Sequence, residues 1–520
     1  MLSASRRIVA ALAAGAAAAI CATGCSSDEP PGAAPRSSAT TLSSAESTTR
    51  LSPGPPQLAR FYDQKPDWED CGEHFECADL DVPLDYDDPS GKTITVAVNR
   101  RRAHSRSDRI GALLVNPGGP GGSGLDYARS TSHVATDAVL ERYDLVGFDP
   151  RGVGQSSSVE CLDDEETDAF IGADASPDTA AEEARIVELS KLFASRCAER
   201  SGDLLGHVST VEAARDMDVL RAVLRDERLH YLGKSYGTYL GATYVELFPD
   251  HVGRVVLDGV VDPELTNEGL NRGQAIGFER ALGAFVEDCV DRSSCPLSGS
   301  RESALRQVDR LLDEIDRRPL PADKGRPLTQ GWAMVGLALG LYDPDYWPAL
   351  RKAIDDAMDG DGDTFMTLAD AYARRDDDGD YRSNAIAAQY AVNCVDRAEV
   401  SDVAVLRGRA KELETEAPVF GDYLGWGSLP CGFWAPKPSA RPGPVRAAGA
   451  APILLVGTTR DPATPYEWAQ SLAGQLESAR LLTYDGDGHT AYRQGSRCVD
   501  RAVDRYLLAG TLPADRMRCG

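Results

Sequence analysis

The sequence predicts an α/β fold in which a helical domain interrupts a mostly parallel sheet. Nearly continuous apolar segments of strand length, such as 110–115, 143–148 and 252–257, alternate with stretches of helical periodicity. Segments of this kind are typical of parallel strands that helices cover on both faces. The alternation stops after about Pro263 and resumes at about Ala451, and the residues between have helical periodicity. We expect this insertion to lie over the carboxyl ends of the strands, where such folds bind ligands.

The N-terminal residues have the pattern of a secretory signal. Two arginines precede an alanine-rich apolar run, Ile8 to Ile20, which is short for a membrane span. The run leads to Cys25 in a context that resembles a lipobox, although Ala22 stands where leucine is usual. We expect residues 1–24 to be a lipoprotein signal peptide and Cys25 to carry lipid such as palmitate. An ordinary signal peptide is the alternative.

The next segment has the composition of a flexible linker. Residues 25–56 are rich in Ser, Thr, Pro and Ala and contain few large apolar side chains, so they cannot bury a core. No later segment is long and apolar enough to cross a bilayer. We therefore expect a protein of the cell envelope, outside the cytoplasm, that only an N-terminal lipid anchor holds at the membrane.

The remaining residues suit one large domain with an insertion. We expect the first part of the α/β core over residues 57–265, the helical cap over 266–445, and the second part of the core over 446–520. The sequence contains no evident internal repeat, and we expect a monomer.

The cysteines indicate an oxidising compartment. The chain has 12, of which Cys21 lies in the signal and Cys25 at the lipid site. The even number that remains favours disulfides, and pairing of neighbours along the chain is the simplest of many connectivities. No metal site is expected, because no C-x₂-C pair occurs. The disulfide candidates are Cys71, Cys77, Cys161, Cys197, Cys289, Cys295, Cys394, Cys431, Cys498 and Cys519.

The formal net charge of −26 limits the classes of partner. So acidic a chain is not expected to bind nucleic acid or anionic lipid headgroups. The charge is compatible with cationic ligands such as peptide amino termini. For most of the acidic residues, a solvated surface that keeps the protein soluble is the simpler explanation.

The strongest catalytic signal is a serine in a glycine-flanked turn. Residues 233–237 read G-K-S-Y-G and directly follow the apolar run Leu229 to Leu232. A strand that ends in G-x-S-x-G and turns into a helix exposes the serine hydroxyl above the sheet, because the glycines let neighbouring elements crowd the turn. Ser235 is therefore the candidate nucleophile.

A serine nucleophile needs a base and an acid that orients the base. Asp461 and His489 each follow an apolar run of strand length. The order serine, aspartate, histidine is that of the α/β-hydrolase fold, so we expect this fold with a mostly parallel sheet and an inserted helical cap domain. Asp485 and Asp487 are alternative acids, but they lie too near His489 in sequence to reach under its ring easily.

The oxyanion of an acyl-transfer reaction needs two backbone N–H donors. We expect one from Tyr236, next to the serine, and one from Gly119 in a glycine-rich loop after a predicted strand. Residues 119–124 also match the dinucleotide pattern G-x-G-x-x-G, with Asp144 downstream. Secreted proteins rarely meet NAD, Pro120 lies inside the loop, and the loop is needed beside the serine. We therefore expect no cofactor.

Several motifs in one order resemble those of a known family. They are residues 116–121, 144–152, 233–238 and 461–465, together with 393–397 in the insertion. They resemble the actinobacterial tripeptidyl-aminopeptidase-like serine hydrolases, which belong to the prolyl-aminopeptidase-like α/β-hydrolase family, and especially mycobacterial cell-envelope lipoprotein serine proteases. The likeness covers almost the whole mature chain, including its cysteine-bearing tail.

This resemblance implies hydrolysis of peptide bonds near a free amino terminus, through an acyl-enzyme on Ser235 and without a cofactor. The partners would be peptide or protein substrates. The resemblance also implies that an acidic group of the cap holds the substrate's ammonium group. Asp396 is the candidate, and a purely structural role is its alternative. A carboxylesterase or lipase with the same triad, and a non-catalytic envelope binding lipoprotein, are the alternative functions.

Overall fold

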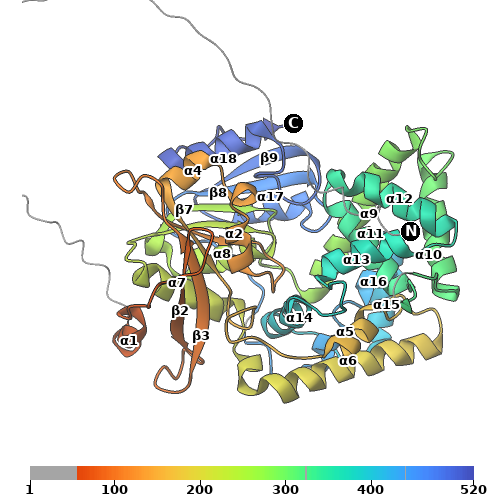
Figure 1. The fold of residues 1–520 in the computed structure, drawn as a ribbon, viewed down its shortest axis with the longest axis horizontal. Helices are drawn as coiled ribbons and strands as arrows, with labels where there is room; N and C mark the ends of the chain where they lie inside the picture. The colour runs from red at the N-terminus through yellow and green to blue at the C-terminus, as the bar shows by residue number, and fades with distance from the viewer. Residues whose placement is uncertain (1–54, 323–324, 440) are drawn as a thin grey trace, which may run out of the picture. The chain divides into compact units, whose positions relative to one another are not determined.

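The computed structural model contains a central sheet with helices packed around it (Figure 1). The structure describes residues 55–322, 325–439 and 441–520. Within them, 10 strands form one sheet in the order β1-β2-β3-β5-β4-β6-β7-β8-β9-β10. The pairings β1/β2, β2/β3 and β3/β5 are antiparallel and the others are parallel. The strands are β1 (Glu69–Asp70), β2 (Phe75–Pro83), β3 (Thr93–Arg101), β4 (Gly111–Asn116), β5 (Tyr143–Phe148), β6 (Leu229–Lys234), β7 (Val252–Asp258), β8 (Ile453–Arg460), β9 (Ala479–Asp487) and β10 (Arg518–Cys519).

Strand β4 illustrates why the strands are apolar along their whole length. Ala112 and Leu114 pack into the hydrophobic cluster on one face of the sheet, whereas Leu113 and Val115 pack into the cluster on the other face. Successive side chains of a strand point to opposite faces, so a strand that is covered on both sides needs a continuous apolar run. The predicted mostly parallel α/β sheet is therefore confirmed.

Two groups of helices cover the sheet. The first group packs on the face that contains Leu114, and the second on the face that contains Leu113. The first comprises α1 (Ala59–Tyr62), α7 (Thr210–Val223), α8 (Tyr236–Leu247) and α17 (Tyr466–Gln475); the second comprises α2 (Gly124–Arg129), α3 (Thr131–Val134), α4 (Asp137–Arg142) and α18 (Arg497–Ala509).

The long connection between β7 and β8 is helical and has a core of its own. Phe278, Leu311, Trp332 and Phe365 belong to a buried cluster that is separate from the two clusters of the sheet. The predicted helical insertion is thus present, and Figure 1 shows its helices grouped beside the sheet. They are α9 (Asn267–Val290), α10 (Arg301–Arg317), α11 (Gln330–Tyr342), α12 (Trp347–Met358), α13 (Asp363–Ala373), α14 (Ala385–Asp396), α15 (Val403–Glu414) and α16 (Gly421–Gly425).

Two helices that precede β6 also contact the insertion, namely α5 (Asp164–Ile171) and α6 (Ala180–Ser201). Asp168 on α5 forms an ion pair with Arg375 at 2.8 Å. Glu183 on α6 forms an ion pair with Arg407 on α15 at 2.6 Å. We assigned the stretch that contains both helices to the first part of the core. Helical periodicity shows that one face of a helix is apolar, but it does not show which element covers that face.

Disulfides join neighbouring cysteines, as expected. The pairs are Cys71–Cys77, Cys161–Cys197, Cys289–Cys295, Cys394–Cys431 and Cys498–Cys519. The predicted signal peptide, the lipid site at Cys25 and the linker up to residue 54 lie outside the described residues. In the part of the chain that the structure describes, no helix has the length and apolar character needed to cross a membrane.

Candidate active site

Ser235 occupies the sharp turn between β6 and α8. Its φ of 55° and ψ of −127° lie in a region that non-glycine residues rarely adopt and that the surrounding structure must hold. The flanking glycines permit the turn. A Cβ on Gly233 would lie 2.3 Å from the carbonyl oxygen of Gly237, and a Cβ on Gly237 would lie 2.8 Å from Asn116 Oδ1. Strand, turn and helix have the geometry of a nucleophile elbow.

Hydrogen bonds hold this turn in its strained conformation. The N–H of Ser235 donates to the carbonyl oxygen of Asp258 at 3.0 Å, which ties the turn to the end of β7. The N–H and the hydroxyl of Thr238 donate to the carbonyl oxygen of Ser235 at 2.8 and 2.6 Å. The Tyr231 hydroxyl donates to the carbonyl oxygen of Gly237 at 2.8 Å. The turn is therefore braced by its own strand, by its own helix and by the next strand.

Asp461 and His489 meet at the ends of the adjacent strands β8 and β9. His489 Nδ1 lies 2.8 Å from Asp461 Oδ1, so the ring donates its Nδ1 proton to the carboxylate and leaves Nε2 as an acceptor. Asp461 is fully buried and also accepts from the N–H groups of Ala463, Thr464 and Thr490 at 3.0, 2.9 and 3.1 Å. These donors fix the orientation of the carboxylate.

The two alternative acids have other partners. Asp487 Oδ1 accepts from Nε of Arg460 at 2.6 Å, and Asp485 pairs with Arg518 at 3.2 Å. Both carboxylates are thus engaged by arginines, whereas Asp461 is the carboxylate that His489 contacts. The geometry therefore favours Asp461 as the acid that orients the imidazole.

The inserted helices also contact the histidine. The N–H of His489 donates to the carbonyl oxygen of Tyr342 at 2.7 Å. The two rings meet edge to face, with their centroids 5.2 Å apart. Thr464 Oγ1 lies 3.4 Å from His489 Nδ1 on the core side. We did not predict Tyr342 or Thr464, because nothing in the sequence indicates which residue of the insertion lies above the histidine.

Lys234 and Asp258 form a buried support beneath the histidine loop. Lys234 Nζ donates to the carbonyl oxygen of Tyr492 at 2.7 Å. The Asp258 carboxylate accepts from the N–H groups of Ala491 and Tyr492 at 3.0 and 2.9 Å. Burial raises the pKa of Asp258 and lowers the pKa of Lys234, while the charge of each opposes the shift in the other. Sequence reasoning missed both residues, although a charged residue that ends an apolar strand was a usable signal.

The glycine-rich loop after β4 packs directly against the nucleophile turn. Gly118 has a φ of +99°, and a Cβ there would lie 2.5 Å from the carbonyl oxygen of Lys234 and 2.7 Å from Ser235 Cβ. Only glycine allows so close an approach. Gly119 and Tyr236 line the same cavity as Ser235. The assignment of their N–H groups as the oxyanion donors stays a prediction.

The alternative reading of this loop as a dinucleotide site is not favoured. Asp144, which would have to hold a ribose, accepts instead from Nε of Arg109 at 2.7 Å and from the N–H of Ala103 at 2.8 Å. A Cβ on Gly124 would lie 2.0 Å from the carbonyl oxygen of Phe148. This glycine therefore lets α2 pack closely on β5.

Ser235 and His489 share a cavity of about 490 Å³ with residues of the inserted helices and of α5 and α6. Among the described residues no aspartate or glutamate lines it, and Arg397 is the lining residue with a permanent charge. Such a cavity suits a short peptide or a small ester. Its walls are mainly apolar and include the aromatic residues Phe170, Phe278, Tyr342, Tyr372, Tyr390, Phe420, Tyr423 and Trp426.

Asp396 is turned away from this cavity, contrary to its predicted role. It is fully buried at the end of α14. One carboxylate oxygen accepts from the N–H of Thr210 at 2.9 Å and the other from the Thr210 hydroxyl. Burial raises the pKa of Asp396 to about 6, against the opposing charge of Arg397. The carboxylate meets the N-terminus of α7, so it is not placed to contact a substrate ammonium group, and we withdraw that assignment.

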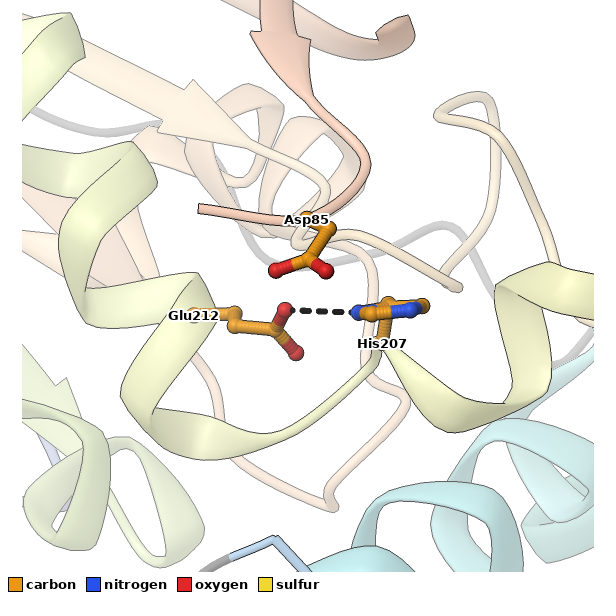
Figure 2. A group of neighbouring side chains, drawn as sticks. All are labelled: Asp85, His207 and Glu212. Atoms are coloured by element: carbon orange, nitrogen blue, oxygen red, sulfur yellow. Dashed lines mark hydrogen bonds and ion pairs between the residues drawn. The ribbon is translucent and has the colours of Figure 1, made fainter. Parts of the chain in front are cut away.

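A separate cluster of titratable side chains comprises Asp85, His207 and Glu212 (Figure 2). Their possible ligand atoms lie within 4.8 Å of one another, and His207 Nδ1 is 3.0 Å from Glu212 Oε1. The guanidinium of Arg151 lies 3.5 Å from the same oxygen and already supplies a positive charge to the cluster. We therefore assign no metal to it.

Comparison with known proteins identifies the family. A family model described as TAP-like protein matches residues 417–519. The chain is 39% identical over 456 residues to the serine protease Hip1 of Mycobacterium tuberculosis, and this alignment covers 85% of this chain and 87% of that protein. It is 36% identical over 487 residues to Carboxylesterase B of the same species, with 90% and 92% covered. It is 35% identical over 471 residues to the tripeptidyl aminopeptidase of Streptomyces coelicolor, with 87% and 85% covered. This serine hydrolase therefore belongs to the tripeptidyl-aminopeptidase-like family of α/β-hydrolases.

Proposed function

We propose that this serine peptidase releases short peptides from the free amino termini of peptide or protein substrates. The observation that carries the proposal is the 2.8 Å contact between His489 Nδ1 and Asp461 Oδ1, in a cavity that His489 shares with Ser235. Such a constellation performs acyl transfer. The relatives named serine protease Hip1 and tripeptidyl aminopeptidase support peptides as the substrate.

The proposed reaction proceeds in two halves. His489 Nε2 takes the Ser235 hydroxyl proton while Oγ bonds to the scissile carbonyl carbon, and the N–H groups of Gly119 and Tyr236 hold the oxyanion. The imidazolium, which Asp461 stabilises, gives its proton to the leaving amine as the C–N bond breaks. A water molecule, deprotonated by His489, then hydrolyses the acyl-enzyme and restores the serine hydroxyl.

The dimensions of the cavity support cleavage near a chain end. A volume of about 490 Å³ under the inserted helices leaves room for a short peptide segment. No aspartate or glutamate of the described residues lines the cavity, so neutral oxygen atoms would bind the amino terminus. Gln274 offers one of them, because its Nε2 donates to the carbonyl oxygen of Ala463 at 3.2 Å and leaves Oε1 as an acceptor.

Ester hydrolysis is the second candidate function. A relative that is 36% identical is named Carboxylesterase B, and the mainly apolar walls of the cavity suit an acyl or alkyl group. The triad can attack an ester as well as an amide. A third function, binding without catalysis, is disfavoured by the complete set of Ser235, Asp461 and His489.

A matched set of fluorogenic substrates distinguishes these functions. It contains peptides with one, two or three residues before the scissile bond, each with a free or an acetylated amino terminus, and short and long acyl esters. Ser235→Ala measures background hydrolysis. Turnover confined to free-amine peptides supports the proposal, and the preferred length gives the number of residues released per cut. Turnover of blocked peptides contradicts the exopeptidase proposal, and turnover of esters alone favours an esterase.

We also infer that the protein is a monomeric lipoprotein of the cell envelope, anchored through Cys25. The signal-like residues 1–24 and the disulfides within the described chain, such as Cys394–Cys431, support an oxidising compartment. Metabolic labelling with a fatty-acid analogue, compared between the wild type and Cys25→Ala, tests the anchor. Equal labelling of the two proteins would contradict the anchor. Analytical sedimentation of the unanchored form measures its mass in solution and so tests whether it is a monomer.

A further inference from the structure

Arg397 is a buried cation that borders the catalytic cavity. It lines the cavity that contains Ser235 and His489, although only 2% of its surface is exposed. It follows α14 directly and belongs to the motif 393–397. The proposed reaction does not use a positive charge at this position. A buried charge is costly unless it is paired or hydrogen-bonded, so its partners decide what it does.

The partners of this guanidinium within the protein are neutral. Nε donates to the carbonyl oxygen of Leu265 at 3.0 Å, and Nη1 donates to Asn393 Oδ1 at 3.2 Å. The group also lies 4.6 Å from the ring centre of Tyr239. Across residues 55–322, 325–439 and 441–520, no carboxylate comes within ion-pairing distance, and Nη2 has no protein acceptor. One edge of the guanidinium is therefore left for a ligand.

The acidic residues near Arg397 are already engaged. Asp396 uses both of its oxygens on Thr210. Glu399 pairs with Arg409 at 3.0 Å and accepts from the Ser428 hydroxyl at 2.7 Å. Neither carboxylate completes the coordination of Arg397, which leaves the cavity with a positive charge that a substrate group can neutralise.

The neighbouring amide adds a second donor. Asn393 also lines the cavity, and because its Oδ1 accepts from Arg397, its Nδ2 is a donor. Arg397 and Asn393 thus place two donors on residues that line one cavity, and a carboxylate accepts from such donors in charge-assisted hydrogen bonds. A neutral amide could also accept from them through its carbonyl oxygen, but it would not neutralise the charge.

This pair of residues is held rigidly. The N–H of Arg397 donates to the carbonyl oxygen of Asn393 at 3.0 Å. The adjacent Cys394 forms a disulfide with Cys431, which also lines the cavity. A preorganised donor pair loses little conformational entropy when a ligand binds.

We propose that Arg397 and Asn393 form a carboxylate-binding subsite of the catalytic cavity. The ligand is a carboxylate of a peptide, either the side chain of a glutamate or aspartate in the released segment or the terminal carboxylate of a short peptide. The proposal rests on the proposed peptidase function. It runs against the net charge of −26, which by itself repels acidic peptides, so a preference for them would have to come from a local site.

Glutamate and glutamine have nearly the same shape, so their comparison isolates the charge. Fluorogenic tripeptide substrates would carry glutamate or glutamine at each of the three positions in turn. We expect glutamate to raise kcat/KM by roughly tenfold or more at one position. In a second arm, a tripeptide acid and its amide would be titrated against Ser235→Ala. Tighter binding of the acid, without a glutamate preference, identifies the terminal carboxylate as the ligand. The proposal is overturned if kcat/KM for the glutamate peptides is no higher than for the glutamine peptides at every position and the tripeptide acid and amide bind equally well.

Variants assign the effect to the subsite. Arg397→Gln is expected to abolish the preference for glutamate over glutamine, and Arg397→Lys to keep part of this preference. If Arg397→Gln does not fold, Asn393→Asp serves instead, because its own carboxylate would occupy the guanidinium. Arg516→Gln, which removes a charge with 94% of its side chain exposed, is the matched control. A preference that survives in both Arg397→Gln and Asn393→Asp contradicts the assignment. Failure of the wild type to hydrolyse neutral peptides would instead count against the proposed function, because the binding arm does not need turnover.

Discussion

Lys234 Nζ donates to the carbonyl oxygen of Tyr492 at 2.7 Å, so the residue before the nucleophile supports the loop that carries His489. Asp258 holds the same loop through two backbone N–H groups. The serine and the histidine are therefore positioned by one buried network, although they come from distant parts of the chain. This network makes the first prediction.

Lys234→Met should lower both stability and turnover. Methionine matches the length of lysine but leaves the Tyr492 carbonyl without its donor and Asp258 without its opposing charge, at a cost of about 3 kcal/mol in the free energy of unfolding. Urea denaturation and kcat measure the two effects. The control is Lys352→Met, which removes an exposed pair with Asp356 and should leave the free energy of unfolding almost unchanged. Equal effects of the two substitutions would contradict the supporting role.

Substitution of the triad should affect turnover far more than folding. Ser235→Ala should lower kcat by about 10⁶-fold. Asp461→Asn should lower it by about 10⁴-fold, because an amide does not hold His489 in the tautomer with a free Nε2. Stopped assays on a peptide substrate, with thermal unfolding as the folding control, measure these losses. Substantial activity in Asp461→Asn would show that another acid orients the imidazole, and Asp487→Asn would then be the next variant to measure.

Gly118→Ala should damage the oxyanion site. The added methyl group would lie 2.5 Å from the carbonyl oxygen of Lys234, so the loop must retreat from the nucleophile turn and carry the Gly119 donor with it. We expect kcat to fall by about 10²-fold or more.

Gly360→Ala separates this clash from backbone strain. Gly360 also has a positive φ, +92°, but nothing lies within 4 Å of its added Cβ. The Gly360→Ala variant should therefore have a somewhat lower free energy of unfolding and an unchanged kcat. Unchanged turnover in Gly118→Ala would show that the loop does not supply the donor.

Asp396 should make stability fall as the pH rises from about 4 to about 6. Burial raises its pKa to about 6, whereas aspartate in an unfolded chain has a pKa of about 3.9. Between these values the folded state keeps a proton that the unfolded state has released, so rising pH favours unfolding, and the loss of about 3 kcal/mol is complete above the folded pKa.

The variant Asp396→Asn tests this linkage. Urea unfolding at pH 4 and pH 7 should show that the stability of the variant, relative to the wild type, increases with pH. Glu188→Gln, at an exposed position, controls for the change in net charge. A difference between Asp396→Asn and the wild type that does not vary with pH would refute the assignment of this pKa.

The sequence predicts the parts of this site whose positions are set by the backbone. Ser235, Asp461 and His489 follow apolar strands, and the carboxyl ends of parallel strands meet at one edge of a sheet, so strand order alone brings the three residues together. The flanking glycines of the elbow were likewise predictable, because their role is set by local backbone geometry.

Side-chain direction at the end of a helix was not predictable. Asp396 and Arg397 are neighbours at the end of α14, yet Asp396 bonds to Thr210 in the core and Arg397 lines the cavity. Which of the two faces the cavity depends on how the end of α14 meets Thr210 of α7, and no periodicity in the sequence reports it. The contact of Tyr342 with His489 was hidden for the same reason.

The hydrogen bond from the His489 N–H to the Tyr342 carbonyl oxygen has a consequence for substrate entry under the proposed function. If α11 swung away from the sheet, the catalytic histidine would lose both a backbone acceptor and the ring that lies against its imidazole. A gap wide enough for a folded protein would thus disable the enzyme at the moment of entry. Extended chain ends that thread beneath the helices would leave this contact intact, so under the proposed function we expect the enzyme to attack frayed termini and to spare folded domains.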